Sequence, residues 1–232
     1  MIVFNGISID SIPGVIVEDV RVSPIRYSPV TRPRAIRWGS EFVRMGGGER
    51  TITLSFAVLD RDLLTRKASL DALSQWARTD AEYKMELPTD TAKFLTCVCT
   101  QKPEPSTRAW WENKLRLVFT CFSNPYWTSK STKGDLCGNE INVLGDAPPL
   151  MQITRTLSSA ASNQTFSNGT QSMTFSTIPS GDLVIDLNAQ TAAVGGNSIM
   201  QYFQPSGSFV LPKLGKQTIT GTGAIVWRER WE

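Results

Sequence analysis

The chain has 232 residues, of which 41% are hydrophobic and 19% are charged, so it can bury a core in one large or two small domains. It contains no histidine, which excludes a Ser-His-Asp or Cys-His catalytic arrangement and a His-ligated zinc site. The formal net charge of +3 lies below the strongly basic range of a dedicated nucleic-acid-binding domain.

The charge is unevenly distributed along the chain. Residues 1–122 hold 17 Lys and Arg against 14 Asp and Glu, whereas residues 123–232 hold 7 against 7 on a background rich in Ser, Thr, Asn and Gly. No apolar run approaches the length of a membrane span, and the N-terminus lacks the pattern of a secretory signal. We therefore expect two domains, 1–128 and 129–232, no membrane insertion, and synthesis in a reducing cytoplasm.

The N-terminal half predicts several strands and one helix. Residues 51–58 alternate apolar and polar side chains, as in a half-buried strand. Further strands are predicted by apolar runs at 15–22, 94–100 and 115–122. Roughly over 61–78 the period is that of an amphipathic helix, which Asp60 or Asp62 can cap. The side chains expected to pack this helix on a sheet are Leu63, Leu70, Leu73 and Trp76. The predicted fold is an α+β domain with one helix on a β-sheet or split barrel.

A basic segment precedes the strand at 51–58. Residues 21–50 contain seven arginines and three prolines and are too polar for a central strand, so we expect a projecting arm near 23–50. Such an arm could be a solvated loop, a contact with a neighbouring subunit or, less in keeping with its few aromatic residues, a nucleic-acid contact. The triple glycine 46–48 is followed by a strand, which predicts a flexible hairpin tip and no phosphate-binding loop. The candidate subunit contacts are Arg32, Arg34, Arg37, Trp38, Arg44 and Arg50.

The C-terminal half predicts an antiparallel β-sandwich without helices, because short apolar pieces are separated by turn residues. Asn168 and Gly169 suit the two positive-φ positions of a type I′ turn, so we expect a hairpin there. Asp182 and Asp186 would share one strand face roughly 13 Å apart, too far for the carboxylate pair of a glycosidase. We expect no catalytic residue, and the chain is not expected to be an enzyme.

Cysteine and tryptophan supply two further sets of candidates. Cys97 and Cys99 share a strand face, and with Cys121 on a neighbouring strand they would suit a soft metal, but no fourth ligand stands at a recognisable spacing. We therefore expect free thiols in the core, with no metal and no cofactor. Trp127 and Trp231 are candidates for the outer surface or for contacts with a partner. Exposed indoles stack on sugars, so the alternative function is a carbohydrate-binding module or adhesin that uses the C-terminal sandwich.

The order of these features resembles one protein family. The N-terminal half is similar to the distal tail proteins of long-tailed (siphovirus-type) bacteriophages. The features that carry this similarity are, in order, an arginine-rich segment, the run Arg50–Phe56, a helix ending in Leu73-Ser-Gln-Trp76, Tyr83, and a closing run 119–126. The runs that resemble the galectin-like domain of that family are 141–153, 181–186 and 209–215. The match extends over nearly the whole chain, and the order and spacing of the pieces carry it.

The resemblance implies a structural role at the tail tip of a virion. It implies a hub in which six copies form a ring at the end of the tail tube, with N-terminal domains in the ring and galectin-like β-sandwiches facing outward. The implied partners are further copies of the chain, the tail tube protein, a tail-tip or tail-associated protein, and a tail fibre or receptor-binding protein used in host attachment. DNA would pass through the lumen without specific binding, and the protein would be made in the host bacterial cytoplasm.

Overall fold

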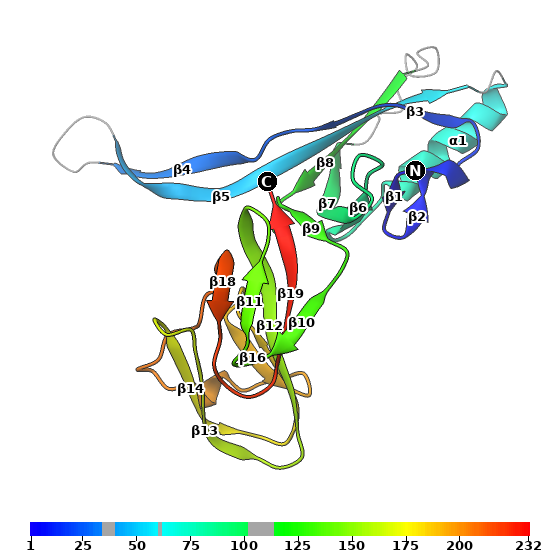
Figure 1. Ribbon diagram of the computed structural model, residues 1–232. Coiled ribbons are helices and arrows are strands. Elements are labelled where there is room, and N and C mark those ends of the chain that lie inside the picture. Colours follow the sequence, from blue (N-terminus) through cyan, green and yellow to red (C-terminus); the bar gives the residue numbers. More distant parts are fainter. Residues whose placement is uncertain (34–39, 60–61, 102–113) are drawn as a thin grey trace. The chain divides into compact units, whose positions relative to one another are not determined.

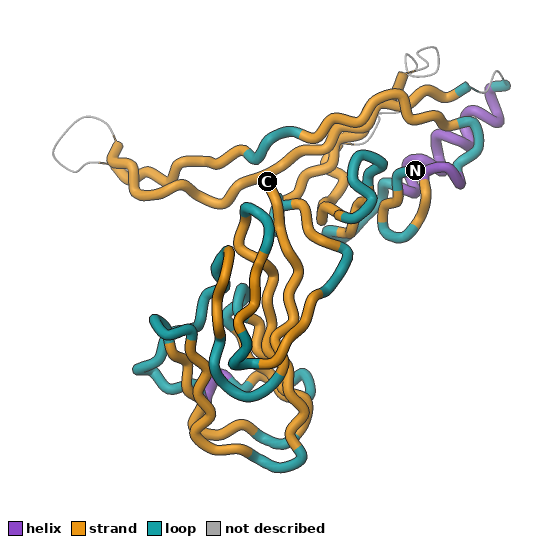
Figure 2. Tube along the Cα trace, viewed as in Figure 1, coloured by secondary structure: helices purple, strands orange, loops and turns teal. Residues whose placement is uncertain are grey.

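The computed structural model describes residues 1–33, 40–59, 62–101 and 114–232, and their side chains except those of 28–47 and 114. The chain divides into two compact units. Unit 1 comprises Met1–Trp127 and Glu232, and unit 2 comprises Thr128–Trp231. Strands predominate in both units (Figures 1 and 2), which confirms the predicted mainly β fold.

In the part of unit 1 that the structure describes, antiparallel strands accompany one α-helix, α1 (Leu63–Trp76). The strands are β1 (Val3–Phe4), β2 (Ile7–Ser8), β3 (Val15–Val22), β4 (Arg26–Pro33), β5 (Ser40–Val58), β6 (Tyr83–Glu86), β7 (Lys93–Gln101), β8 (Lys114–Cys121) and β9 (Trp127–Ser129), the last of which crosses into unit 2. One run of paired strands is β3, β5, β8, β7, and another is β7, β6, β1, β2. Strand β7 therefore belongs to both and joins the two halves of the unit.

The core of unit 1 lies against the inner face of β5. Its inward-facing side chains, which are almost fully buried, are Ile52, Leu54, Phe56 and Val58. This is the face that the alternation at 51–58 predicts. At the centre of the core, the rings of Phe4, Trp76 and Phe119 meet edge to face with centroids 4.9 to 5.9 Å apart. Such edge-to-face pairs add to the stabilisation from buried apolar area.

Hydrogen bonds fix α1 at both ends. At its start, Asp62 Oδ2 accepts a hydrogen bond from the backbone N–H of Thr65 at 3.0 Å. Hydrogen bonds from Thr65 lower the pKa of the Asp62 carboxyl, as expected for an N-cap that is favoured in its charged form. Near its end, the indole N–H of Trp76 donates to the carbonyl oxygen of Ile7 at 3.0 Å. The helix is thereby tied to β2.

The buried face of α1 is shorter than predicted. Its buried residues are Ser69, Leu73 and Trp76, and Leu70 is partly buried against the same core. Leu63, which we expected on this face, is 58% exposed. Leu63 is in the first helical turn, and this turn contributes no buried residue. The helix packs on the core only from Ser69 onward.

Residues 26–49 contain a two-stranded ribbon (Figure 1). The second half of β5 lies between β3 and β8, whereas its first half, Ser40 to Glu49, pairs only with β4 among the described residues. Ten residues of β-strand span about 33 Å, so the ribbon is long. The triple glycine 46–48 lies inside β5, so its prediction as a hairpin tip was wrong. At Gly48 a Cβ atom would overlap the side chains of Ile25 and Tyr27, which explains why the strand has glycine there.

Unit 2 is a β-sandwich. Its strands are β10 (Lys133–Leu136), β11 (Glu140–Val143), β12 (Ala147–Leu157), β13 (Ala161–Ser167), β14 (Ser172–Ile178), β15 (Gly181–Asp186), β16 (Thr191–Val194), β17 (Asn197–Ser198), β18 (Gly215–Thr218) and β19 (Ala224–Trp231). One antiparallel sheet has the order β17, β16, β15, β12, β19, β10, and the pairs β13–β14 and β11–β18 form two ribbons. Side chains from the sheet and from the ribbons share one core, which includes Ile153, Ile185, Ile225, Phe166 and Phe175.

The hairpin between β13 and β14 has a longer loop than expected. The strands end at the pair Ser167 and Ser172, so the loop has four residues and is not a two-residue type I′ turn. Only Gly169 has positive φ, at 84°. Asn168 instead accepts hydrogen bonds at Oδ1 from the backbone N–H groups of Thr170 and Gln171, at 3.1 and 2.8 Å. The Asn168 side chain therefore caps the turn. Turns favour asparagine for such hydrogen bonds to the backbone as well as for its tolerance of positive φ.

Candidate functional site

The acidic residues considered for catalysis are engaged in unit 2. Asp182 accepts a hydrogen bond from Thr156 Oγ1 at 2.7 Å, and Asp186 accepts one from Gln152 Nε2 at 2.9 Å. Each pair is also a cross-strand pair of β12 and β15, so these contacts stabilise the sheet. Among the described residues, no three His, Cys, Asp or Glu side chains lie close enough together to hold a metal ion.

The sheet of unit 2 carries two open hollows of about 500 and 210 Å³. The larger is lined by Thr154–Thr156, Asp182–Val184, Gly223 and Ala224, none of which is aromatic. The smaller has one aromatic residue in its lining, Trp227, which is 6% exposed. Sugars are held by stacking on exposed rings. Neither hollow therefore favours the alternative of a carbohydrate-binding module.

The predicted subunit contacts fall on three kinds of position. Arg32 lies in β4 opposite Glu41, and Arg44 lies in β5 opposite Val30. Arg34, Arg37 and Trp38 lie outside the described residues. The backbone pairing thus places two of the arginines on the ribbon, which is the part of unit 1 that pairs with no other described strand.

Arg50 differs from the other candidates because it belongs to the inner face of unit 1. It is 4% exposed and lies opposite Cys121 of β8. Residues two apart in a strand point to the same face, so the Arg50 side chain is directed to the core face of β5, as are those of Ile52 and Leu54. The prediction of Arg50 as a surface contact with another subunit was therefore wrong.

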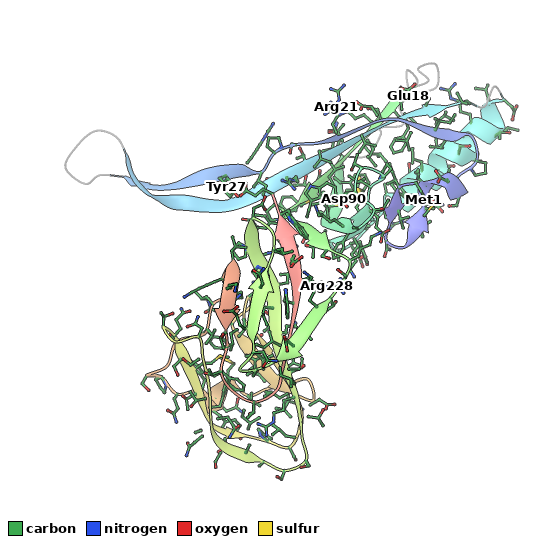
Figure 3. All side chains as sticks on the ribbon, in the orientation of Figure 1. Met1, Glu18, Arg21, Tyr27, Asp90 and Arg228 are labelled. Carbon is green, nitrogen blue, oxygen red and sulfur yellow. The ribbon has the colours of Figure 1, made fainter. Side chains whose placement is uncertain are left out.

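The root of the ribbon is held by polar contacts that the sequence did not predict. Where β3 ends, Ser23 N–H donates to the carbonyl of Thr51 at 2.9 Å, and Thr51 N–H donates back to Ser23 Oγ at 2.9 Å. Farther along, the hydroxyl of Tyr27 (Figure 3) donates to Glu232 Oε1 at 2.9 Å. A hydrogen bond with Tyr126, burial and the Glu232 contact together raise the pKa of Tyr27 far above its usual value. The Tyr27 contact thus ties the ribbon to the C-terminal residue.

The two candidate tryptophans are partly buried. Trp127 packs against the core of unit 1, and Trp231 is in β19 of unit 2. Several large apolar side chains that were not singled out from the sequence are also well exposed in unit 1. Ile16, Leu59 and Leu64 are 48%, 57% and 79% exposed and lie in β3, directly after β5 and in the first turn of α1.

No family model matches the sequence, and no curated protein does. Among solved structures, the crystal structure of the SPP1 Dit (gp 19.1) protein, titled a paradigm of the hub adsorption apparatus in phages infecting Gram-positive bacteria, is similar with a TM-score of 0.76. The match covers 100% of this chain and 98% of that chain at 14% identity. The resemblance to distal tail proteins predicted from the sequence is confirmed at the level of the fold.

Two structures of the phage p2 baseplate in its activated conformation, with Sr and with Ca, also match. Their TM-scores are 0.44 and 0.42 at 11% and 9% identity, over 94% of this chain and 91% of those chains. In the described part of the chain, no helix is both long enough and apolar enough to cross a membrane.

Proposed function

We propose that this protein is a non-enzymatic structural hub at the tail tip of a long-tailed bacteriophage. The observation that carries the proposal is the fold likeness to SPP1 Dit over the whole chain, with a TM-score of 0.76. The polar side chains considered for catalysis support it as well, because Asp182 and Asp186 are engaged within the sheet of unit 2. Function in such a protein depends on which surfaces meet other chains.

In this proposal, six copies form a ring, and residues 1–128 of each copy make its wall. Residues 129–232 form the outward-facing β-sandwich. The division of the chain between Trp127 and Thr128 supports these limits, since each unit has its own core. The exposed side chains of Ile16, Leu59 and Leu64 suit burial against a neighbouring subunit.

The ribbon is the proposed grip between neighbours. Its strands leave hydrogen-bonding edges for another chain, because β4 pairs only with β5 among the described residues. Its arginines favour protein partners, since the planar guanidinium forms paired hydrogen bonds with carboxylates. The proposed contact residues are Arg32, Arg34, Arg37, Trp38 and Arg44.

The ring is proposed to join the tail tube protein on one side to a tail-tip, tail-associated or fibre protein on the other. The protein is made in the host cytoplasm and ends in the virion tail. DNA passes through the lumen without specific binding. The net charge of +3 supports weak interaction with DNA, because tight nonspecific binding needs many phosphate contacts.

The mass of the purified chain in solution tests the proposal. We expect a species of six times 25.6 kDa at micromolar concentration and low salt, with a central hole in negative-stain images. Antibody against the chain should label the tail tips of virions that contain it. A monomer at all concentrations, together with virions labelled elsewhere than the tail tip, would overturn the proposal.

A further inference from the structure

Two buried cysteines oppose each other across β7 and β8. Val98 of β7 pairs with Thr120 of β8, so the next opposing positions in the antiparallel register are Cys97 and Cys121. Directly opposed residues in antiparallel strands have Cα atoms about 4.5 to 5.5 Å apart, which lies within the range of about 4.4 to 6.8 Å found in disulfides. Both side chains are 0% exposed and belong to the core of unit 1.

Burial and the opposing thiol both act on Cys97. A hydrogen bond between the Cys97 and Cys121 side chains, together with burial and the nearby carboxylate of Glu82, raises the pKa of Cys97. The thiol form of Cys97 is therefore favoured in the folded chain. On the other side of Cys121, its cross-strand neighbour is Arg50 of β5, which is 4% exposed.

The remaining two cysteines lack this arrangement. Cys99 lies on the same face as Cys97 but is opposite Phe119, so it is a diagonal neighbour of Cys121 at about 7 to 8 Å between Cα atoms. That separation is too long for a disulfide without movement of the backbone. The Cys99 thiol donates to the carbonyl of Gln101 at 3.6 Å, and Cys137 belongs to unit 2. Both serve as internal controls.

We propose that Cys97 and Cys121 form an oxidation site, which a peroxide converts to a disulfide between β7 and β8. One of the two thiols gives up its proton, and its sulfur attacks a peroxide oxygen, which breaks the O–O bond; in hydrogen peroxide the other oxygen takes up that proton and leaves as water. The second sulfur then attacks the sulfenic sulfur, and its proton leaves with the hydroxyl group as a second water. Two thiols lose two electrons in total, and one peroxide takes them up.

The biological setting of this step rests on the proposed function. A tail protein is made in a reducing cytoplasm, where the pair stays as thiols, and then acts outside the cell, where oxidants are present. The disulfide would join two strands that meet in the proposed wall of the ring. It would close a loop between positions 97 and 121, which restricts the unfolded chain and raises resistance to denaturation.

The test uses the full chain with Cys99→Ser, because Cys97 and Cys99 lie on one tryptic peptide. The folded, reduced protein is treated with hydrogen peroxide, and the remaining thiols are alkylated in denaturant. We expect a mass loss of about 2 Da, one alkylated thiol at Cys137, and a peptide that links Cys97 to Cys121. Cys97→Ser and Cys121→Ser variants in the same background should form no internal disulfide. The oxidised protein should unfold at a higher temperature than the reduced one.

Three free thiols in the Cys99→Ser protein after prolonged peroxide treatment, or a link that involves Cys137, would overturn the inference. The chemistry needs no ring, so a monomer that forms the disulfide would support the site and contradict only the proposed assembly.

Discussion

Lys133 donates a hydrogen bond from Nζ to Oε1 of Glu229 at 2.6 Å, and this carboxylate is only 7% exposed. The same oxygen accepts the backbone N–H of Leu144 at 3.0 Å. One buried oxygen therefore connects β10, the turn after β11 and the last strand, β19. Removing this carboxylate takes a charged acceptor away from both donors at once.

Glu229→Ala should lower the free energy of unfolding of unit 2 by about 1 to 3 kcal/mol, because the Lys133 ammonium and the Leu144 N–H lose the buried charged acceptor that they share. Glu229→Gln retains an amide oxygen at the same place and should cost less. Urea unfolding of the full chain measures both. The matched control is Glu140→Gln, which removes an ion pair with Lys216 in which both side chains are well exposed. Equal losses in Glu229→Ala and the control would contradict the importance of the buried oxygen.

The hydrogen bond from Trp76 to Ile7 predicts a graded series at the end of α1. Trp76→Phe keeps an aromatic ring beside Phe4 but leaves the Ile7 carbonyl without its donor, so it should cost about 1 to 3 kcal/mol. Trp76→Ala also leaves a cavity and should cost about 3 to 5 kcal/mol. Leu63→Ala, on the exposed first turn, should change stability by less than about 0.5 kcal/mol. A large loss in Leu63→Ala would show that the first turn packs on the core after all.

Gly48 predicts a specific steric coupling at the root of the ribbon. Gly48→Ala should destabilise the protein by roughly 1 to 3 kcal/mol, because the new Cβ atom meets Ile25 and Tyr27. Ile25→Ala should relieve part of that loss in the double variant, which thermal unfolding of all four proteins measures. Gly134→Ala in β10 is the control, since its Cβ atom would have its nearest neighbours at ordinary distances of 3.5 and 3.6 Å. Simple additivity of Gly48→Ala and Ile25→Ala would contradict the contact.

Tyr27 predicts a loss of stability in alkaline solution. Its pKa in the folded chain is raised above the ordinary value of 10.0, so folding favours the protonated hydroxyl. The Tyr27 hydroxyl contributes fully to folding stability below pH 10.0, where it is protonated in both the folded and the unfolded chain. This contribution is lost as the pH rises through the range in which the hydroxyl ionises only in the unfolded chain. Melting temperatures measured across this range should fall more steeply for the natural chain than for Tyr27→Phe. Identical slopes, or a Tyr27 that ionises with the other tyrosines in absorbance titration, would contradict the prediction.

Local periodicity was sufficient for some of the regular elements of unit 1. The apolar run at 15–22 coincides with β3, and the alternation at 51–58 identifies the buried half of β5, because burial of one face imposes a period of two. The first half of β5 could not be predicted in this way. It pairs with β4 through backbone groups, and the arginines and prolines of residues 21–50 dominated the local signal.

The errors at Arg50 and Gly48 have a common cause. In each case the prediction gave more weight to the type of residue than to its position in the strand. Arg50 alternates in register with the buried residues Ile52 and Leu54. Gly48 lies inside β5, where the side chains of Ile25 and Tyr27 leave no room for a larger residue. The contact between Tyr27 and Glu232 could not be predicted from the sequence for another reason. The two residues are 205 positions apart, and no short-range pattern links them. The same holds for the opposition of Cys97 and Cys121, which depends on strand register.

Arg44 tests whether the ribbon holds neighbouring subunits together. Reversing its charge with Arg44→Glu should convert an attraction to carboxylates into a repulsion, and a change of about 1.4 kcal/mol per contact already shifts the dissociation constant tenfold. We expect rings of the natural chain to loosen as salt increases, and Arg44→Glu to be monomeric where the natural chain is assembled. Lys216→Glu makes the same change of charge in unit 2 and should leave the assembly intact. Analytical ultracentrifugation compares the three proteins, with circular dichroism to verify folding. Unchanged assembly of Arg44→Glu and of Arg32→Glu would exclude ribbon arginines as the grip, whatever the number of subunits.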